Sequence, residues 1–129
     1  MRIRLRSMLV VLVGAASLAG CSVDENEQGM KLSLLRVADQ TLSRGETNKV
    51  AITVTRGSFT GEVDVKFQNL PSGVTVVDAG AIPADDNIRS YTLHAAPDAD
   101  LVERHRAEVV VSGPENLETS QAFEITVKE

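Results

Sequence analysis

The fold class of this chain is decided by residues 49–55 (KVAITVT) and residues 62–67 (EVDVKF). In both stretches apolar and polar side chains alternate with a period of two. Successive side chains of a β-strand point to opposite faces, so this alternation predicts two strands, each with one face toward a core. Gly57–Gly61, between them, has the composition of a turn or loop. We therefore expect a β-protein built around this pair of strands.

The same alternation recurs along the rest of the chain, from Met30 onward. It predicts strands at 90–95, 107–112 and 123–127, and we expect the shorter run Val74–Val77 to be an edge strand. No long window shows helical spacing. About seven short strands in roughly 100 residues predict an all-β fold, an antiparallel two-sheet sandwich of immunoglobulin type. A small barrel is the alternative.

The first expected strand, Met30–Val37, changes phase within its length. Leu32 and Leu34 share one side, whereas Leu35 and Val37 share the other. Such a change predicts a bulge, as where a first strand crosses between two sheets. The apolar phases of the other strands predict a core that contains Val50, Ile52, Val54, Val63, Val65, Phe67, Leu93, Val109, Val111, Phe123 and Ile125.

Composition and charge exclude one class of function. The chain has 129 residues, of which 43% are apolar, enough to bury a single core. It contains 13 Lys and Arg and 18 Asp and Glu. Without Arg2, Arg4 and Arg6, 10 basic residues oppose 18 acidic ones, a net charge of about −8. Such a surface repels phosphate backbones, so we expect no nucleic acid as a partner.

The N-terminus predicts an export signal. Met1–Arg6 is basic, and Met8–Ala19 is an apolar run of twelve residues. A membrane-spanning helix needs about 20 apolar residues, whereas a run of about 12 is typical of the hydrophobic region of a secretory signal. No Arg-Arg pair occurs there, which favours general secretion over the twin-arginine route.

Leu18-Ala19-Gly20-Cys21 follows this run and resembles the lipobox of bacterial lipoproteins. A thiol can be alkylated by a diacylglycerol, and the small residues at 19 and 20 let a peptidase close on the bond before Cys21. The resemblance implies cleavage between Gly20 and Cys21, acyl chains such as palmitate at Cys21, and a membrane-anchored mature chain. Ser22 stands where an Asp would signal inner-membrane retention, so in a host with two membranes we expect the outer membrane, facing the periplasm or the cell surface. Cys21 is the only cysteine, and no internal disulfide is expected.

The chain divides into three expected parts. Residues 1–20 are a lipoprotein signal peptide, residues 21–29 are the lipidated cysteine with a flexible linker, and residues 30–129 are the β-sandwich domain. The linker is predicted because residues 22–29 (SVDENEQG) are polar, acidic and without periodicity.

Short structural motifs follow one another along the domain: Arg44-Gly45-Glu46, Val50-x-Ile52-x-Val54, Phe59-Thr60-Gly61-Glu62-Val63, Leu70-Pro71-Ser72-Gly73-Val74 and Tyr91-Thr92-Leu93-x-Ala95. In this order they resemble the immunoglobulin-like modules of bacterial extracytoplasmic proteins. The resemblance covers residues 40 to 112 and implies the fold, but its motifs are structural and imply little about function. The chain departs from the family at Leu101–Arg106, where the family has a Gly and a Tyr leading into the penultimate strand.

The residues do not assemble a catalytic constellation. His94 falls on the polar phase of its strand, and His105 lies between Arg104 and Arg106. Neither accompanies a Ser in a Gly-flanked turn, so we expect no nucleophilic catalysis. A zinc site takes about four Cys or His ligands, which the mature chain does not supply. We therefore expect neither an enzyme nor a cofactor.

A tethered module that binds a small ligand, either calcium or carbohydrate, is the alternative function. Asp85–Asn87 form one oxygen-rich cluster, and Asp98 and Asp100 form another, but their spacing matches no calcium loop. Carbohydrate binding needs aromatic platforms, and Phe59 alone among the rings is expected to be exposed.

A segment before the penultimate strand is the candidate partner contact. It groups Arg104, His105 and Arg106 in an otherwise acidic domain, with Leu101 and Val102 beside them as apolar anchors. Interface hot spots commonly combine such elements. We expect this loop to contact an acidic partner or an anionic envelope polymer; a solvated loop is the alternative.

These observations together predict a membrane-anchored lipoprotein whose immunoglobulin-like domain has a non-enzymatic binding or structural role in the bacterial cell envelope. Its expected partners are the membrane, through the lipid on Cys21, and an envelope protein or polymer that the sequence does not identify.

Overall fold

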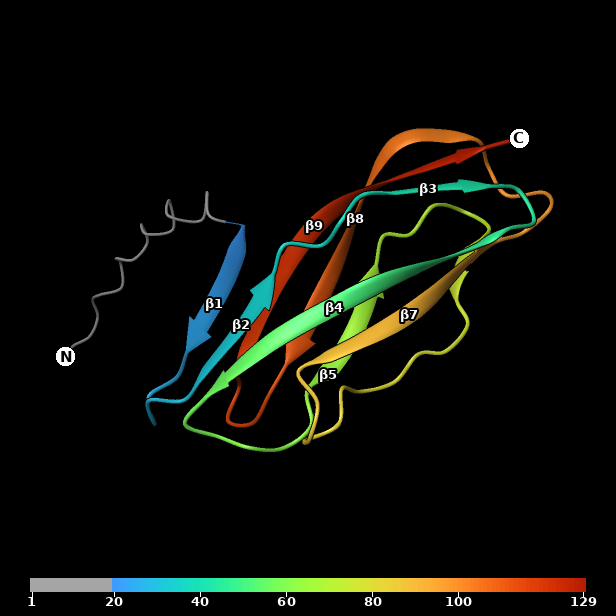
Figure 1. The fold of residues 1–129 in the computed structure, drawn as a ribbon. Helices are drawn as coiled ribbons and strands as arrows, with labels where there is room; N and C mark the ends of the chain where they lie inside the picture. Colours follow the sequence, from blue (N-terminus) through green and yellow to red (C-terminus); the bar gives the residue numbers. More distant parts are fainter. Residues whose placement is uncertain (1–19) are drawn as a thin grey trace.

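Residues 20–129 of the chain are described by a computed structural model; the predicted signal peptide lies outside them except for its last residue, Gly20. The described residues form two β-sheets packed face to face around one core (Figure 1). The nine strands are β1 (Cys21–Glu25), β2 (Lys31–Leu35), β3 (Gln40–Ser43), β4 (Thr47–Gly57), β5 (Asp64–Gln68), β6 (Val74–Val76), β7 (Ile88–Ala95), β8 (Val102–Ser112) and β9 (Glu118–Lys128). Within this part of the chain no helix is long and apolar enough to cross a membrane.

The strand order identifies the fold as immunoglobulin-like. One sheet has the order β1-β2-β4-β7-β6 and the other β3-β9-β8-β5. Strands β2, β4, β7 and β6 correspond to A, B, E and D of an immunoglobulin domain, and β5, β8 and β9 correspond to C, F and G. In Figure 1, β4 crosses in front of β8 and β9. The predicted two-sheet sandwich is therefore confirmed, with nine strands in place of about seven, and the predicted edge strand at Val74–Val77 is confirmed as β6.

The predicted phase change marks the crossing between the sheets. Leu32 and Leu34 are buried from β2, whereas Leu35 is exposed and Val37 is buried beyond the end of that strand. The chain then enters the second sheet as β3, which runs parallel to β9. The crossing is a break of four residues between two strands and not a bulge within one strand. Strand β3 was not predicted from the sequence, because it is short and places polar Gln40 inward.

The prediction of a flexible linker at residues 21–29 is corrected by the structure, in which Cys21–Glu25 form strand β1. It pairs antiparallel with β2, with Cys21 opposite Leu35. The inward side chains of β1 are polar, so the strand lacks an apolar alternation. Asp24 accepts a hydrogen bond from the Glu118 amide at 2.9 Å. The Asn26 side chain accepts from the Met30 amide at 3.0 Å and closes the turn into β2. Main-chain pairing and these polar contacts hold β1, so the domain starts at Cys21 and not at Met30.

The predicted core is confirmed except at the edge strand β5. Nine of its eleven residues are buried, whereas Val65 and Phe67 are half-buried and pack against the core. Phe67 makes edge-to-face contacts with Tyr91 and Phe123, with ring centres 5.4 and 6.3 Å away. The exposure arises because β5 and β6 are the outermost strands of their sheets on this side.

Candidate functional site

Cys21 is the first residue of β1 and lies at the outer edge of the five-stranded sheet. Its thiol is free and half-buried. Strand alternation places its side chain outward, on the phase of Val23, while Ser22 and Asp24 face the other sheet. The predicted lipid would thus be attached to a residue of the sheet and not to the end of a flexible tether.

The predicted partner contact is a bulged strand start and not a loop. β8 begins at Val102, and its register with β9 shifts between Val102 and His105. Arg104 occupies the bulge with φ of 53°, and its amide donates to Thr126 Oγ1 at 3.1 Å. An extra residue in one strand re-aims the side chains beside it. The bulge therefore decides which members of the predicted contact meet.

The structure separates the apolar and basic members of this contact. Leu101 and Val102 line a shallow hollow of about 450 Å³ with the C-terminal end of β9. Arg106 lines another, of about 260 Å³, with Arg36, Asp39 and Glu124 among its neighbours. His105 belongs to neither, because its Nε2 lies 2.8 Å from the Asn69 carbonyl oxygen.

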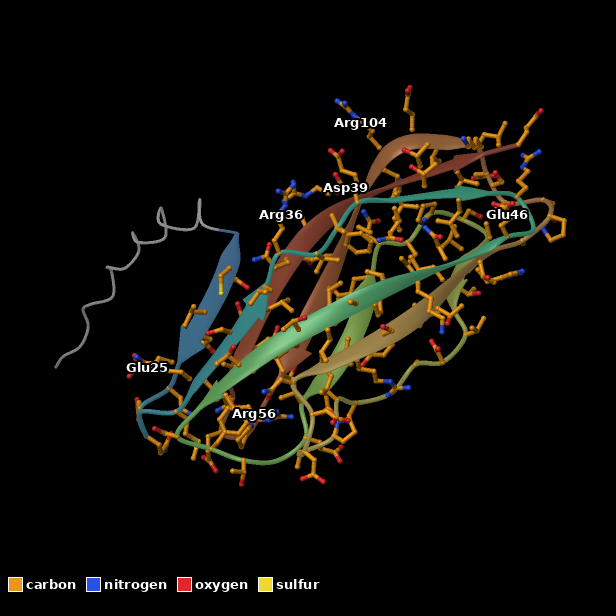
Figure 2. All side chains as sticks on the ribbon, in the orientation of Figure 1. Glu25, Arg36, Asp39, Glu46, Arg56 and Arg104 are labelled. Atoms are coloured by element: carbon orange, nitrogen blue, oxygen red, sulfur yellow. The ribbon has the colours of Figure 1, made fainter. Side chains whose placement is uncertain are left out.

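Arg104 projects into solvent beside the second hollow. Its Nε lies 3.9 Å from Glu124 Oε1, and the two side chains are 76% and 46% exposed. An ion pair this open contributes little to stability. Figure 2 shows Arg104, Arg36 and Asp39 along one side of the molecule. The basic side chains are thus free to meet an anionic group, and contact with a partner there stays a prediction.

The aromatic rings offer no flat platform for a sugar. Tyr91 and Phe123 are buried and Phe67 is half-buried. Phe59, the ring expected to be exposed, is half-buried and packed against the core. These are all the aromatic residues of the chain.

The expected oxygen-rich clusters take part in loop contacts through their main chain and through one side-chain oxygen, that of Asn87. The Arg56 guanidinium donates to Asn87 Oδ1 at 3.1 Å and to the Asp86 carbonyl at 2.8 Å. A fixed positive charge at this position opposes a bound cation. The Asp100 amide donates to the Ser72 carbonyl at 3.1 Å. Within residues 20–129, no group of three or more His, Cys, Asp or Glu side chains is placed to hold a metal ion.

A hollow of about 510 Å³ lies where the sandwich is open between β5 and β6. Its floor is apolar, with Phe67, Leu70 and Tyr91 among its lining residues, and Lys66 lies at its margin. The sequence did not predict this hollow, because it depends on which two strands end their sheets on the same side.

Arg89 organises a polar cluster that the sequence analysis missed. Its guanidinium donates to the carbonyls of Ala81 and Asp78 at 2.8 and 2.7 Å, and stacks on Tyr91. The Tyr91 hydroxyl donates to the Gly80 carbonyl at 2.6 Å. Burial raises the pKa of Tyr91, against the opposing effect of the Arg89 charge. The signal available in the sequence was a basic residue on the inward phase of a strand.

The Asp78 carboxylate completes this cluster. It accepts from the Thr92 amide at 2.7 Å and from the Thr92 hydroxyl at 3.0 Å. The Thr92 amide is the main cause that lowers the pKa of Asp78. Together with the Arg89 contacts, these hydrogen bonds hold residues 78–81 against β7. The cluster therefore has a structural role.

Comparison with known proteins finds no matching protein-family model and no matching curated protein. Among solved structures, the crystal structure of the titin M3 domain matches with a TM-score of 0.44 and 16% identity, over 76% of this chain and 97% of that one. A chimeric titin Z1Z2 functionalized with a KLER exogenous peptide from decorin matches with a TM-score of 0.43 and 18% identity, over 72% of this chain and 89% of that one. The immunoglobulin-like fold of this chain follows from its own strand order.

Proposed function

We propose that this chain is an exported bacterial lipoprotein, anchored through Cys21, whose immunoglobulin-like domain has a non-enzymatic binding or structural role in the cell envelope. The observation that carries the proposal is Leu18-Ala19-Gly20-Cys21 directly after a basic head and an apolar run. Two or three acyl chains on one residue anchor stably, at about 0.8 kcal/mol for each buried methylene. With Ser22 next to the cysteine, the proposed location in a host with two membranes is the outer membrane.

The position of Cys21 supports this proposal. It is the first residue of an edge strand, and its side chain is on the outward phase, opposite to that of the buried residues Leu32 and Leu34 of β2. A diacylglycerol on its Sγ therefore extends away from the core and leaves the packing intact.

The domain architecture supports a binding or structural role. The inward strand faces form the core, and function in sandwiches is carried by loops, edges and outer faces. Arg104 and Arg106 are exposed and project from a domain with a net charge of about −8. We therefore propose an acidic envelope protein or anionic polymer as partner. The small-ligand alternative has less support, since none of the four aromatic side chains is fully exposed as a platform for a sugar and Asn87 is engaged by Arg56.

The test is processing of the full chain in a bacterial host. We expect a protein that partitions into detergent, with the mass of residues 21–129 plus acyl groups. Cys21→Ser should accumulate as unprocessed precursor because no thioether can form. Ser22→Ala is the matched control: its Oγ is buried and makes no hydrogen bond, so processing should continue. A Cys21→Ser protein still cut after Gly20 and released in soluble form would refute the proposal.

A further inference from the structure

The outer face of the five-stranded sheet gathers most of the exposed apolar side chains. Val23, Leu35, Val77 and Ile88 are 58%, 45%, 60% and 55% exposed, and all four lie on β1, β2 and β7 or directly after β6. Val77 continues the outward phase of β6, and its amide donates to the Thr92 carbonyl at 3.0 Å. The remaining large exposed apolar residue within 20–129 is Leu101, which precedes β8 in the other sheet.

The strand registers put Cys21 in line with this apolar surface. Cys21 is opposite Leu35 across β1 and β2, and Thr53 is opposite Ile88 across β4 and β7. The register between β2 and β4 ends with Leu34 opposite Val54, and one further step along both strands brings Leu35 beside Thr53. Directly paired residues share a face of the sheet, so Cys21, Leu35, Thr53 and Ile88 form a row across four strands. Val23 lies two residues along β1 from Cys21, on the same face.

The same face carries few charges: two bases and one acid at strand positions, and beside them the Asp78 carboxylate, which accepts from the hydroxyl of outward Thr92. Its outward strand positions hold one acid, Glu25, and two bases, Lys31 and Lys49; the others are small, hydroxylated or apolar residues and His94. Figure 2 shows Glu25 at the end of β1 that leads into the turn, away from Cys21. The outward positions of the other sheet carry many charges of both signs: Asp64, Lys66, Arg106, Glu108, Glu118, Glu124 and Lys128.

We propose that this outer face, around the row Cys21-Leu35-Thr53-Ile88, lies on the lipid bilayer to which Cys21 is anchored. The proposal rests on the lipidation proposed above. Because the main chain of Cys21 is part of the sheet, acyl chains on its Sγ leave from this face with no slack in the backbone. Apolar side chains that surround an anchor enter the boundary between headgroups and acyl chains, and basic residues among them are attracted by anionic headgroups.

This orientation determines which surface of the domain remains exposed to other partners. The sheet β3-β9-β8-β5 turns its outer face away from the membrane, and with it Arg106 and the exposed Arg104. The acidic residues of that outer face, Asp64, Glu108, Glu118 and Glu124, are then held away from the anionic headgroups. The bilayer is thus the partner of one face, and the opposite face is left to a protein or polymer.

The experiment uses the lipidated full-length product with one added cysteine. Lipidation consumes the Cys21 thiol, so the new thiol alone takes an environment-sensitive fluorophore. Ala51→Cys is exposed on the proposed face, and Thr41→Cys is the matched exposed position on the outer face of the other sheet. In vesicles of phosphatidylcholine and phosphatidylglycerol that contain brominated lipid, we expect quenching of the label at residue 51 and none at residue 41.

Introducing acidic residues into the apolar surface gives the second readout. Leu35→Glu combined with Ile88→Glu should abolish quenching of the residue 51 label while the protein still floats with the vesicles. Leu101→Glu changes an equally exposed apolar residue outside the face, and should leave quenching intact.

The outcomes separate the two proposals. A protein that floats but is quenched equally at both positions, or at neither, overturns the orientation and leaves the lipoprotein proposal standing. A protein that does not float overturns both. A label at residue 51 that is shielded only at high protein concentration, without quenching by brominated lipid, shows a second copy on this face and overturns the orientation.

Discussion

The Arg89 guanidinium lies over the ring of Tyr91, its carbon 4.7 Å from the ring centre. The two residues are neighbours on the inward phase of β7, where a charged side chain would ordinarily be costly. Arg89 is tolerated because its guanidinium donates hydrogen bonds to the carbonyls of Asp78 and Ala81. The flat face of the guanidinium stacks on the ring of Tyr91. The pair holds residues 78–81 against β7.

Arg89→Met should destabilise the domain by about 1–3 kcal/mol, since it removes the cation–π contact and two charged donors while keeping the stem. The pKa of Tyr91 should rise further, because the Arg89 charge that lowers it is gone. Tyr91 is the only tyrosine, so tyrosinate absorbance in a pH titration reports this group alone. Arg36→Met, at an exposed arginine, is the control. An unchanged Tyr91 titration in Arg89→Met would contradict the assigned contact.

The Asp78 carboxylate should make stability depend on acid pH. Its pKa in the folded state lies below the ordinary value of 3.8, so the unfolded chain takes up the proton first as pH falls. The stabilisation is therefore present above 3.8 and is lost as pH falls through the folded pKa. Denaturant midpoints measured down this range should fall less steeply for Asp78→Asn than for the parent. Equal slopes for the two proteins would show that the Thr92 contacts do not hold the ionised form.

Phe123→Ala and Phe67→Ala should differ, although both side chains are on the core phase. Truncation of a buried Phe costs about 3–5 kcal/mol, which we expect for Phe123. Phe67 is half-buried on an edge strand, so we expect about 2–3 kcal/mol there. Thr53→Ala, on the outward phase of β4, should change the free energy of unfolding little. A larger loss at Thr53 than at Phe67 would mean that the strand phase is wrong.

Gly73→Ala should be more destabilising than Gly45→Ala, although both positions have positive φ, 91° and 81°. A Cβ at Gly73 would lie 2.6 Å from the Cα of buried Ala99, whereas nothing lies within 4 Å of one at Gly45. Gly45→Ala should therefore lose only the left-handed backbone penalty, about 1–2 kcal/mol. Gly73→Ala should lose more because the loop around Ala99 must move. Thermal unfolding of the two variants measures the difference, and equal losses would rule out the close approach.

Arg104→Asn combined with Arg106→Ser should weaken capture of an acidic partner and make capture less sensitive to salt, since fewer screened charges remain. The melting temperature should not change: the Arg104–Glu124 pair is exposed, and Asn tolerates the φ of 53° at residue 104. Crosslinking in intact membranes at several ionic strengths measures the effect. Capture that is unaltered in the double variant would remove this segment as the contact.

The sequence by itself determined the strands that carry an apolar alternation, the side that each turns to the core, and the motif that ends at Cys21. These features are local, because the pleat alone sends successive side chains to opposite faces. They sufficed to predict a two-sheet sandwich and most of its core. They also indicated a crossing near the end of Met30–Val37, which the structure places at residues 36–39, since a phase change within one run is visible without knowledge of any other strand.

Tertiary structure alone decided the features that depend on pairing between distant segments. β1 is a strand because the free edge of β2 accepts its main chain, although its inward side chains are polar. The bulge at Arg104 separates the predicted contact residues, and it exists only in the register between β8 and β9. The row from Cys21 through Leu35 to Ile88 likewise joins residues from four strands. Register is a property of hydrogen-bonded pairs of strands, and so no single stretch of sequence contains it.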